Sequence, residues 1–491
     1  MSRRNNSFAF FTASGRILAM IASFLMPIFL TRYLTQENYG LYSQFNMLVG
    51  FMSSIFSFGM QSNLYYYFPN SDEQRKKALL GNTYFSMLVL AIVAFVVLLV
   101  PTTAKLFMGN EKLMNFSLLV AIGIFFSVPI TLIYPLFVTQ GDKTLSVIYP
   151  PLEALLRIGI VIGAALIFKS IESILASMVF YHVLQFIFVT LYASWPYRKV
   201  KGNWFDWELL KSQFAYAAPF GLAVILRTIF NRFDKMLCIS FITPEEYAIY
   251  ALAFYGIPGI SQVYESVAEV NVLNMSAAYK ENKIQEIVSL AQSYVTRLMS
   301  FSIPVVLGVF VFANVLFEFL FPPEYAKAVP FFRVYVFSFV FGALGAGLVL
   351  RATGKTRLTL KAFLRSSVIF LPFAYFSIRY YGTWGAITTA MLGILLPKIF
   401  QISFEMKVLN VSFWEYLPWK KIGSIILISI VFLLPVALLN HFVKLNIFVA
   451  GAVGVVYVLA VWWMELKRGL FIVNKETLTD YLSKIKLFGK K

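Results

Sequence analysis

The chain has 491 residues, of which 59% are hydrophobic and only 13% charged, and its mean hydropathy is +0.75. No soluble domain of this size has such a composition, so the sequence predicts an all-α protein that crosses a membrane many times. One cysteine, Cys238, excludes an intrachain disulfide. Two histidines without clustered thiols do not form the pattern of a metal site, so neither a metal nor a cofactor is expected.

Apolar stretches long enough to cross a bilayer follow one another along almost the whole chain. The start, MSRRNNSFAF, lacks a signal-peptide cleavage pattern, so we expect the apolar run behind it to be retained as a first span. We predict about 14 spans, joined by turns too short to hold a folded catalytic domain. The predicted spans are 10–34, 40–68, 79–102, 113–139, 145–168, 171–195, 213–241, 247–273, 291–320, 330–350, 358–378, 383–409, 421–441 and 446–466.

Lysines and arginines concentrate on one set of alternate loops. Because positively charged loops stay in the cytoplasm, this bias places both termini there, which also requires an even number of spans. The net charge of +19 is then explained by topology and contact with anionic membrane lipids, and no nucleic-acid partner is expected. The cation-rich side carries Arg3, Arg4, Arg75, Lys76, Lys77, Lys143, Arg198, Lys199, Lys201, Lys211, Lys280, Lys283, Arg351, Lys355, Arg357, Lys361, Lys407, Lys420, Lys421 and the cations from Lys467 to Lys491.

Two short motifs occur twice, at nearly the same offset along the chain. LTQENYGLY (Leu34–Tyr42) returns as ITPEEYAIY (Ile242–Tyr250), and TQGDKT (Thr139–Thr144) returns as ATGKT (Ala352–Thr356). An even number of predicted spans separates the copies, so they share one orientation and indicate two pseudo-symmetric six-helix lobes. We therefore divide the chain into an N-terminal lobe (1–196), an interfacial linker (197–212), a C-terminal lobe (213–409) and two additional spans with a cytoplasmic tail (410–491).

The linker and the tail both have the character of surface segments. In the linker, Trp204 and Trp207 lie among several lysines, which suits a helix at the membrane interface. In the tail, residues 477–488 place apolar side chains at helical spacing among lysines, which is typical of a basic amphipathic helix on the cytoplasmic leaflet.

Helix breakers occur at corresponding positions of the two repeats. Gly50 in the second predicted span aligns with Pro258 in the eighth. Interrupted spans at matching positions indicate a moving substrate site, so we predict Gly50 and Pro258 as hinge residues. An ordinary proline kink is the alternative interpretation.

The predicted span 213–241 contains an unusual number of charges. Arg227, Asn231, Asp234 and Lys235 share a helix face within an arc of about 100°. Each buried charge costs at least about 2.5–3.5 kcal/mol at the centre of a membrane helix, so this face meets water or partners rather than lipid. Arg232 lies within the same run. A structural Arg–Asp pair is the alternative to a functional role.

Other charges in the spans extend this pattern. Arg16, Arg297 and Arg365 lie in the cytoplasmic third of their spans, where Arg16 and Arg297 could also reach the lipid headgroups. A cationic interior open to the cytoplasm suits an anionic cargo such as a pyrophosphate, which guanidinium groups bind bidentately. Asp234 is our candidate for ion coupling or gating, and Glu265 and Glu269 of the eighth span are rival candidates.

Tyrosines gather where the second predicted span ends. The run from Tyr65 to Phe68 reads YYYF and lies at the cytoplasmic end of that span. An interfacial aromatic belt is one interpretation. A platform for sugar rings is the other, because tyrosine combines an apolar ring with a polar hydroxyl.

The motifs resemble those of a known family. Asn231–Lys235 (NRFDK), followed after eight residues by Pro244–Tyr250 (PEEYAIY), resembles the seventh-to-eighth helix signature of bacterial polysaccharide exporters, and Thr35–Tyr42 (TQENYGLY) resembles the turn after their first helix. Together with the duplicated lobes, the resemblance covers the whole chain. The chain is identified as similar to oligosaccharide flippases of the Wzx type, in the multidrug/oligosaccharidyl-lipid/polysaccharide (MOP) exporter superfamily, which act in O-antigen and lipopolysaccharide biosynthesis.

This resemblance implies a fold and a cargo. The fold would be a V-shaped, MATE-like pair of lobes around a central cavity in the bacterial inner (cytoplasmic) membrane. The cargo would be an undecaprenyl-pyrophosphate-linked oligosaccharide, moved to the periplasmic leaflet by alternating access and passed to glycan polymerase or ligase machinery. Arginines of the first and seventh helices serve the pyrophosphate in relatives, and the matching positions are Arg16, Arg227 and Arg232.

Three alternatives remain beside this interpretation. A multidrug exporter of the MATE type, exchanging cations, predicts an acidic cavity, whereas the balance of charges here is cationic. A lipid II flippase of peptidoglycan synthesis would also be cationic. An integral-membrane glycosyltransferase or polymerase would show a long periplasmic loop or clustered catalytic acids, so we expect a transporter and not an enzyme. Coupling to H⁺ or Na⁺ is compatible with the sequence.

Overall fold

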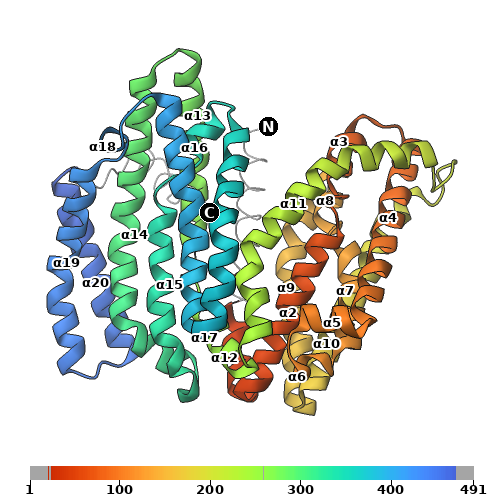
Figure 1. Cartoon of the computed structure of the whole chain (residues 1–491), viewed down its shortest axis with the longest axis horizontal. Coiled ribbons are helices and arrows are strands. Elements are labelled where there is room, and N and C mark those ends of the chain that lie inside the picture. Colours follow the sequence, from red (N-terminus) through yellow and green to blue (C-terminus); the bar gives the residue numbers. More distant parts are fainter. Residues whose placement is uncertain (1–19, 21–23, 258, 471–491) are drawn as a thin grey trace, which may run out of the picture. The chain divides into compact units, whose positions relative to one another are not determined.

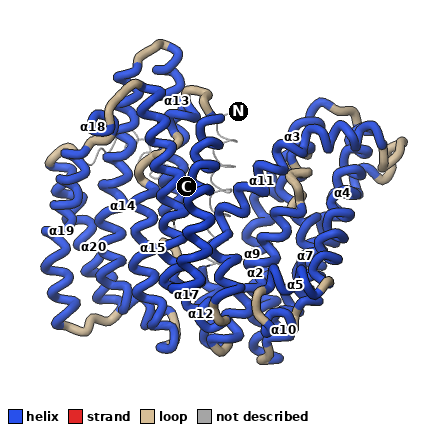
Figure 2. Tube along the Cα trace, viewed as in Figure 1, coloured by secondary structure: helices blue, strands red, loops and turns tan. Residues whose placement is uncertain are grey.

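The computed structural model describes residues 20, 24–257 and 259–470. Within them the chain is helical, with loops between helices and no strand (Figure 2). A bilayer explains this choice, because a helix satisfies every backbone N–H and C=O within its own segment. Nine helices of the described part are long and apolar enough to cross a membrane. The chain is therefore a multi-pass membrane protein.

The predicted spans coincide with helices wherever the structure describes them. The span 10–34 is described only in part, and residues 24–33 are helical. The spans 40–68, 113–139, 247–273 and 330–350 are each interrupted between shorter helices. The spans 358–378 and 383–409 form one continuous stretch, α17 (Thr356–Leu409), that turns at Gly382, whose φ is +53°. The partly described first span, the three spans 40–68, 247–273 and 330–350, and the merged pair account for the difference between nine long helices and the predicted count of 14, which stays a prediction.

The chain packs into two compact units. Unit 1 comprises Met1–Leu252 and Leu371–Thr389, and unit 2 comprises Ala253–Phe370 and Ala390–Lys491. The tip of the hairpin within α17 belongs to unit 1, where Tyr375 contacts Phe241 with ring centroids 5.6 Å apart. The lobe boundaries proposed from the sequence stay a prediction.

Unit 1 contains most of the helices of the first repeat and the start of the second. Its core lies where α2, α4, α7 and α10 pack together. Its elements are α2 (Gln36–Phe56), α3 (Ser62–Tyr67), η1 (Phe68–Asn70), α4 (Glu73–Leu99), α5 (Pro101–Met108), α6 (Glu111–Met114), α7 (Ser117–Ile130), α8 (Ile133–Thr139), α9 (Lys143–Phe168), α10 (Ile171–Ser194), η2 (Trp195–Tyr197), α11 (Trp207–Phe241) and α12 (Pro244–Ala253), which ends one residue into unit 2.

Unit 2 is organised around one long helix, α14 (Ile284–Leu320). It packs against α13, α15, α19 and α20, and these helices run side by side in the green-to-blue part of Figure 1. The two last helices, which have no counterpart in the first repeat, thus cover α14. The other elements are α13 (Ile260–Lys280), η3 (Pro323–Ala328), α15 (Val329–Gly342), α16 (Leu348–Ala352), the outer parts of α17, α18 (Phe413–Tyr416), α19 (Trp419–Phe442) and α20 (Ile447–Lys467).

The repeated motifs have equivalent local structures. Thr35 and Thr243 each accept a hydrogen bond from the backbone N–H three residues later, at 3.3 and 3.2 Å, and so cap the helices that follow. Gly141 and Gly354 both turn the chain with a positive φ, +69° and +71°, before the next helix begins. The two sequence matches therefore mark matching turns.

The fourth and tenth predicted spans are both interrupted, which the sequence analysis did not predict. Residues 131–132 separate α7 from α8, and residues 343–347 separate α15 from α16. In the second case Gly345 and Gly347 have positive φ, and the buried carboxylate of Glu405 accepts the N–H of Val349 at 2.8 Å. Glu405 thus accepts a backbone N–H at the buried start of α16 that has no partner within the helix.

The predicted hinges fall differently in the two repeats. Gly50 lies inside the continuous helix α2, and the interruption follows about two turns later, at residues 57–61. In the second repeat the helix is interrupted at residues 254–259, where Gly259 has a φ of +85°. Pro258 lies outside the described residues. The hinge role of both residues stays a prediction.

The linker is not the separate interfacial helix that we expected. After η2 the chain is irregular up to Asp206, whose carboxylate caps α11 by accepting the N–H of Leu209 at 3.0 Å. Buried polar side chains fasten this loop to α4: Lys77 donates to the carbonyl of Val200 at 2.7 Å, and Asn82 donates to that of Asp206 at 2.8 Å. The linker is therefore held by hydrogen bonds to α4, and not by contact of an amphipathic helix with the membrane interface. The tail segment 477–488 lies outside the described residues.

Candidate functional site

The charged helix α11 presents Arg227 to its surroundings. This side chain is exposed, and it makes no ion pair or hydrogen bond with the described residues. An arginine near the middle of a membrane span cannot face hydrocarbon without a large cost, so Arg227 must meet water or a ligand. The structural Arg–Asp pair, our alternative interpretation for this residue, is not formed in the described part of the chain.

Arg232 has a different environment on the same helix. It is half-buried and lies against α2 at Gly50, where an added Cβ would come within 2.9 Å of its Nη1 atom. Gly50 therefore provides the space that the guanidinium occupies. The two predicted residues are brought together by the fold, although the sequence analysis assigned them to separate roles.

Asp234 is buried rather than open to a cavity. Only 5% of its surface is exposed, and the hydroxyl of Tyr250, which is also buried, donates a hydrogen bond to it at 2.5 Å. Tyr250 is the last residue of ITPEEYAIY, the second copy of the first motif, and lies on α12, so this bond joins α11 to α12. The motif gave a signal for Tyr250, but its partner could not be read from the sequence.

The two copies of the first motif touch each other within unit 1. An added Cβ on Gly40 would lie only 1.8 Å from the carbonyl oxygen of Pro244, so the backbones are in direct contact. Lys112, just before the fourth predicted span, bridges the copies: its Nζ lies 2.7 Å from Glu37 and 3.4 Å from Glu245. Glu37 and Glu245 occupy equivalent positions in the two copies.

Lys112 stays protonated over the whole physiological pH range. The hydrogen bond with Glu37 raises the pKa of Lys112 above the usual 10.5, and the charge of Glu245 acts in the same direction. Because the pKa of Lys112 is higher in the folded than in the unfolded protein, the bridge contributes its full stabilisation at pH values below the unfolded-state pKa. This stabilisation is lost only as the pH rises through the folded-state pKa. Lys112 could not be identified from the sequence as a partner of these glutamates, because it lies far from both in the chain.

The remaining predicted site residues lie in unit 2, except for Arg16. Arg297 on α14 is half-buried, and its Nε has no hydrogen-bond partner among the described residues. Arg365 on α17 is exposed and lies over the ring of Phe404 at 5.0 Å. Glu265 and Glu269 are both on the exposed face of α13. Arg16 lies outside the described residues.

No group of three or more potential metal ligands occurs within the described ranges. The charged groups described above are guanidinium, ammonium and carboxylate groups on helices. On α11, exposed or half-buried arginines could bind an anion, and Glu37 of α2 and Glu245 of α12 lie around Lys112 of α6.

Comparison with known proteins identifies the family. Residues 8–270 match the model of the polysaccharide biosynthesis protein family. The chain belongs to this family. The matched region contains α11, with Arg227, Arg232 and Asp234, and both copies of the first motif, so the features described above lie within the family's own sequence region.

Similar proteins support the same assignment of fold. An uncharacterised membrane protein of Methanocaldococcus jannaschii is 24% identical over 485 residues, which covers 91% of each chain. A lipid II flippase, MurJ, in an inward-closed conformation is 15% identical, with a TM-score of 0.73 over 95% of this chain and 99% of that one. An inward-facing multidrug transporter of the MATE family is 16% identical, with a TM-score of 0.61 over 80% and 94%. The chain shares the fold of these two proteins, which confirms the MATE-like helical fold that the resemblance implied.

We expect that substitution of Gly50 impairs transport because it displaces the side chain of Arg232. Gly50→Leu should expel the guanidinium from its place on α2 and reduce transport about as much as Arg232→Ala does. Loss of helix stability cannot be the cause, because replacing glycine stabilises a helix by up to about 1 kcal/mol. The measurement is transport by membrane-inserted variants, with Gly159→Leu as control, because Gly159 lies on α9 with nothing within 4 Å of an added Cβ.

A double variant distinguishes this explanation from general damage. Gly50→Leu combined with Arg232→Ala should transport no worse than Arg232→Ala alone, because both changes remove the same contact. Additive losses would show that Gly50 acts independently of Arg232.

We expect Asp234→Asn to lower transport and to remove its dependence on an imposed pH or sodium gradient, if Asp234 is the coupling residue. The change keeps the size of the side chain and a hydrogen-bond acceptor for Tyr250 but removes the charge. The measurement is transport in vesicles with and without the gradient. Tyr250→Phe is the matched control, since it removes the hydrogen bond and leaves the charge. Gradient dependence that survives in Asp234→Asn but disappears in Glu265→Gln or Glu269→Gln would assign the role to α13.

Proposed function

We propose that this protein is a flippase that moves an undecaprenyl-pyrophosphate-linked oligosaccharide from the cytoplasmic to the periplasmic leaflet by alternating access. Membership in the polysaccharide biosynthesis family and the MOP transporter fold support a lipid-linked cargo. The observation that carries the proposal is Arg227: an exposed cation in a membrane span, without a partner among the described residues.

Electrostatics explain why such a cargo needs this helix. Moving an anion from water into hydrocarbon costs of order 20 kcal/mol per charge, so the pyrophosphate must travel through a wet path lined by cations. Arginine suits this task, because its planar fork donates two parallel hydrogen bonds to a phosphate. The polyprenyl tail can remain in lipid. An inside-negative potential favours outward movement of negative charge by about 2.3 kcal/mol per charge per 100 mV, so ion coupling is an addition and not a requirement.

A lipid II flippase is the second candidate. It is favoured by one observation, the TM-score of 0.73 with MurJ, although at 15% identity this similarity concerns the fold alone. Both cargoes present a pyrophosphate to the protein, and the family model favours the oligosaccharide. Export of cationic drugs would need anionic groups where α11 presents Arg227.

The proposed direction of transport depends on the topology, which reporter fusions can check. Under this proposal, the cation-rich loops lie on the cytoplasmic side of a bacterial inner membrane. A reporter fused after Lys77, Lys201 or Lys421 should therefore signal cytoplasm, and one fused after Glu37, Glu246 or Glu324 should signal periplasm. One reversed location would contradict both the span count and the orientation.

Complementation tests the choice of cargo. A bacterial strain that lacks its own oligosaccharide flippase should regain surface glycan when it expresses this protein, and a strain depleted of its lipid II flippase should not regain viability. The reverse result would assign the protein to peptidoglycan synthesis. If surface glycan is restored, glycan polymerases or ligases would act on the oligosaccharide that this protein delivers.

A further inference from the structure

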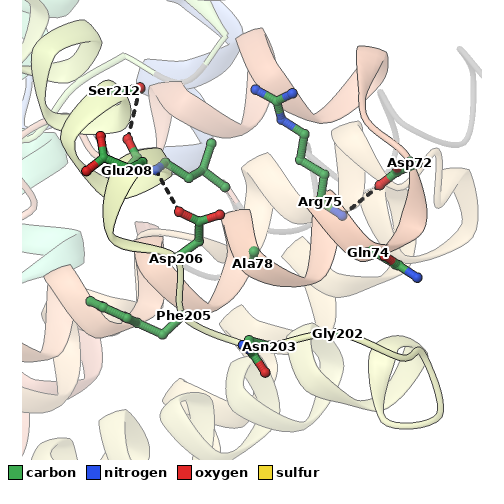
Figure 3. A pocket seen from close by; sticks show the side chains of 11 residues that line it. Asp72, Gln74, Arg75, Ala78, Gly202, Asn203, Phe205, Asp206, Glu208 and Ser212 are labelled. Carbon is green, nitrogen blue, oxygen red and sulfur yellow. Dashed lines mark hydrogen bonds between the residues drawn. The ribbon is translucent and has the colours of Figure 1, made fainter.

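A polar pocket of about 680 Å³ opens on unit 1, between the start of α4, the loop after η2 and the first turns of α11 (Figure 3). Its size lies within the range typical of small-molecule sites. Polar side chains from all three segments line it, among them Asp72, Gln74, Arg75, Asn203, Asp206 and Ser212.

Several of these groups are free to bind a ligand. The amides of Gln74 and Asn203 and the guanidinium of Arg75 make no hydrogen bond or ion pair with the described residues, and Arg75 extends away from Asp72 in Figure 3. Asp72 and Asp206 each use one carboxylate oxygen to cap a helix, at 2.8 and 3.0 Å. The pocket therefore offers both donors and acceptors.

A group of four tyrosines, Tyr65, Tyr66, Tyr67 and Tyr216, adjoins the pocket; we call it the tyrosine patch. The rings of Tyr66 and Tyr216 stack with centroids 4.5 Å apart, and Tyr67 meets both edge-on at 4.8 and 5.7 Å. Tyr65 and Tyr66 remain about half exposed. The hydroxyl of Tyr67 donates to the carbonyl of Ser212, a residue that lines the pocket, at 3.3 Å, so the patch contacts the pocket wall.

One face of α11 connects this region to the candidate anion site. Ser212, Tyr216 and Arg227 lie within an arc of about 60° on the helix. Arg227 lies about 16 Å beyond Tyr216 along the axis, at 1.5 Å per residue. A ligand whose anionic head binds Arg227 could therefore extend along the helix to the tyrosines and the pocket.

We propose that the pocket and the tyrosine patch bind the sugars of the cargo, and that they select neutral or amino sugars over acidic ones. This inference rests on the proposed flippase function. Sugar rings have apolar C–H faces, which suit exposed tyrosine rings, and hydroxyl edges, which suit the free amides and carboxylates. Three carboxylates, of Asp72, Asp206 and Glu208, line the pocket with one arginine. Glu208 is paired with Lys211 at 2.9 Å, so the two aspartates beside Arg75 are the groups that disfavour acidic sugars.

The same charge balance separates this site from an aromatic belt at the lipid headgroups. Anionic phospholipids gather around clusters of cations. Cations of the cation-rich side, such as Lys76 and Lys211, lie next to lining residues in the chain, but the lining itself has three carboxylates and one arginine. Three of the tyrosines contact one another beside it. We therefore assign the tyrosine patch to glycan binding, the second of the two interpretations that the sequence left open.

Saturation-transfer NMR on the full-length protein in nanodiscs tests the inference. The probes are diacetylchitobiose and maltotriose as neutral sugars, glucuronate as an acidic sugar and glycerol phosphate as a headgroup. We expect transfer to the ring protons of at least one neutral sugar, reduced several-fold in Tyr66→Ala/Tyr216→Ala and retained in Tyr66→Phe/Tyr216→Phe. The control is Tyr380→Ala/Tyr381→Ala, which removes two exposed tyrosines elsewhere in unit 1.

Four results would overturn the proposal: no transfer to either neutral sugar, transfer unchanged by the alanine pair, a preference for glucuronate, or displacement of the sugar by glycerol phosphate. The Phe pair guards against misfolding, because it keeps the rings and removes only the hydroxyls. Complementation separates the two proposals. Restored surface glycan without sugar binding would refute this inference alone, whereas sugar binding without restored glycan would refute the flippase function alone.

Discussion

Replacing Arg227 by alanine is expected to abolish glycan export while leaving the protein in the membrane. The exposed guanidinium is proposed to bind the pyrophosphate bidentately, and hydrogen bonds to charged groups contribute about 1.5–3 kcal/mol, or about ten- to hundred-fold in affinity. Arg232→Ala should act in the same direction. Lysine at either position should restore export only in part, because it keeps the charge but lacks the planar fork.

Surface glycan in a complemented strain, normalised to the amount of protein in the membrane, is the measurement. Arg379→Ala is the matched control: this arginine also lies in unit 1, but it donates to the hydroxyl of Tyr375 at 2.6 Å and has no proposed role in binding. Full export by the Arg227→Ala/Arg232→Ala variant would contradict the assignment of the anion site to α11.

A cross-link between the two motif copies is expected to stop transport completely. Gly40 touches Pro244, and Lys112 bridges Glu37 and Glu245. If alternating access separates these copies once in every cycle, joining Glu37→Cys to Glu245→Cys with a short reducible bifunctional thiosulfonate should hold them together. Transport should fall to background and return after reduction.

The chain is well suited to this experiment. Its single native cysteine, Cys238, is buried and should not react. Each single-cysteine variant, treated with the same reagent, controls for modification without a link. Undiminished transport by a fully cross-linked protein would show that the motif copies stay together throughout the cycle.

The architecture could be predicted from sequence because it depends on local patterns. Apolar runs of span length place the helices, and the turn residues Thr35, Thr243, Gly141 and Gly354 have the same role in both repeats. The interruptions were harder to predict. A glycine or proline is compatible with either a continuous or a broken helix, and Gly50 illustrates this, because it serves close packing against Arg232 inside a continuous helix.

The candidate site could be predicted only along single helices. Helical spacing showed that Arg227 and Asp234 share a face of α11, but it could not show that Asp234 is buried against Tyr250 while Arg227 is exposed. Contacts between distant segments decide such differences. The Lys112 bridge and the pocket beside α4 were missed for the same reason.

Flipping by the purified protein in liposomes tests the central claim most directly. Vesicles are loaded with an undecaprenyl-pyrophosphate-linked oligosaccharide on both leaflets, and a membrane-impermeant glycosidase cleaves the outer pool. With the wild-type protein, we predict that the inner pool also becomes accessible and that cleavage proceeds to completion. With Arg227→Ala/Arg232→Ala, cleavage should stop at the outer pool. Cleavage confined to the outer pool with the wild-type protein, or complete with the double variant, would contradict the account.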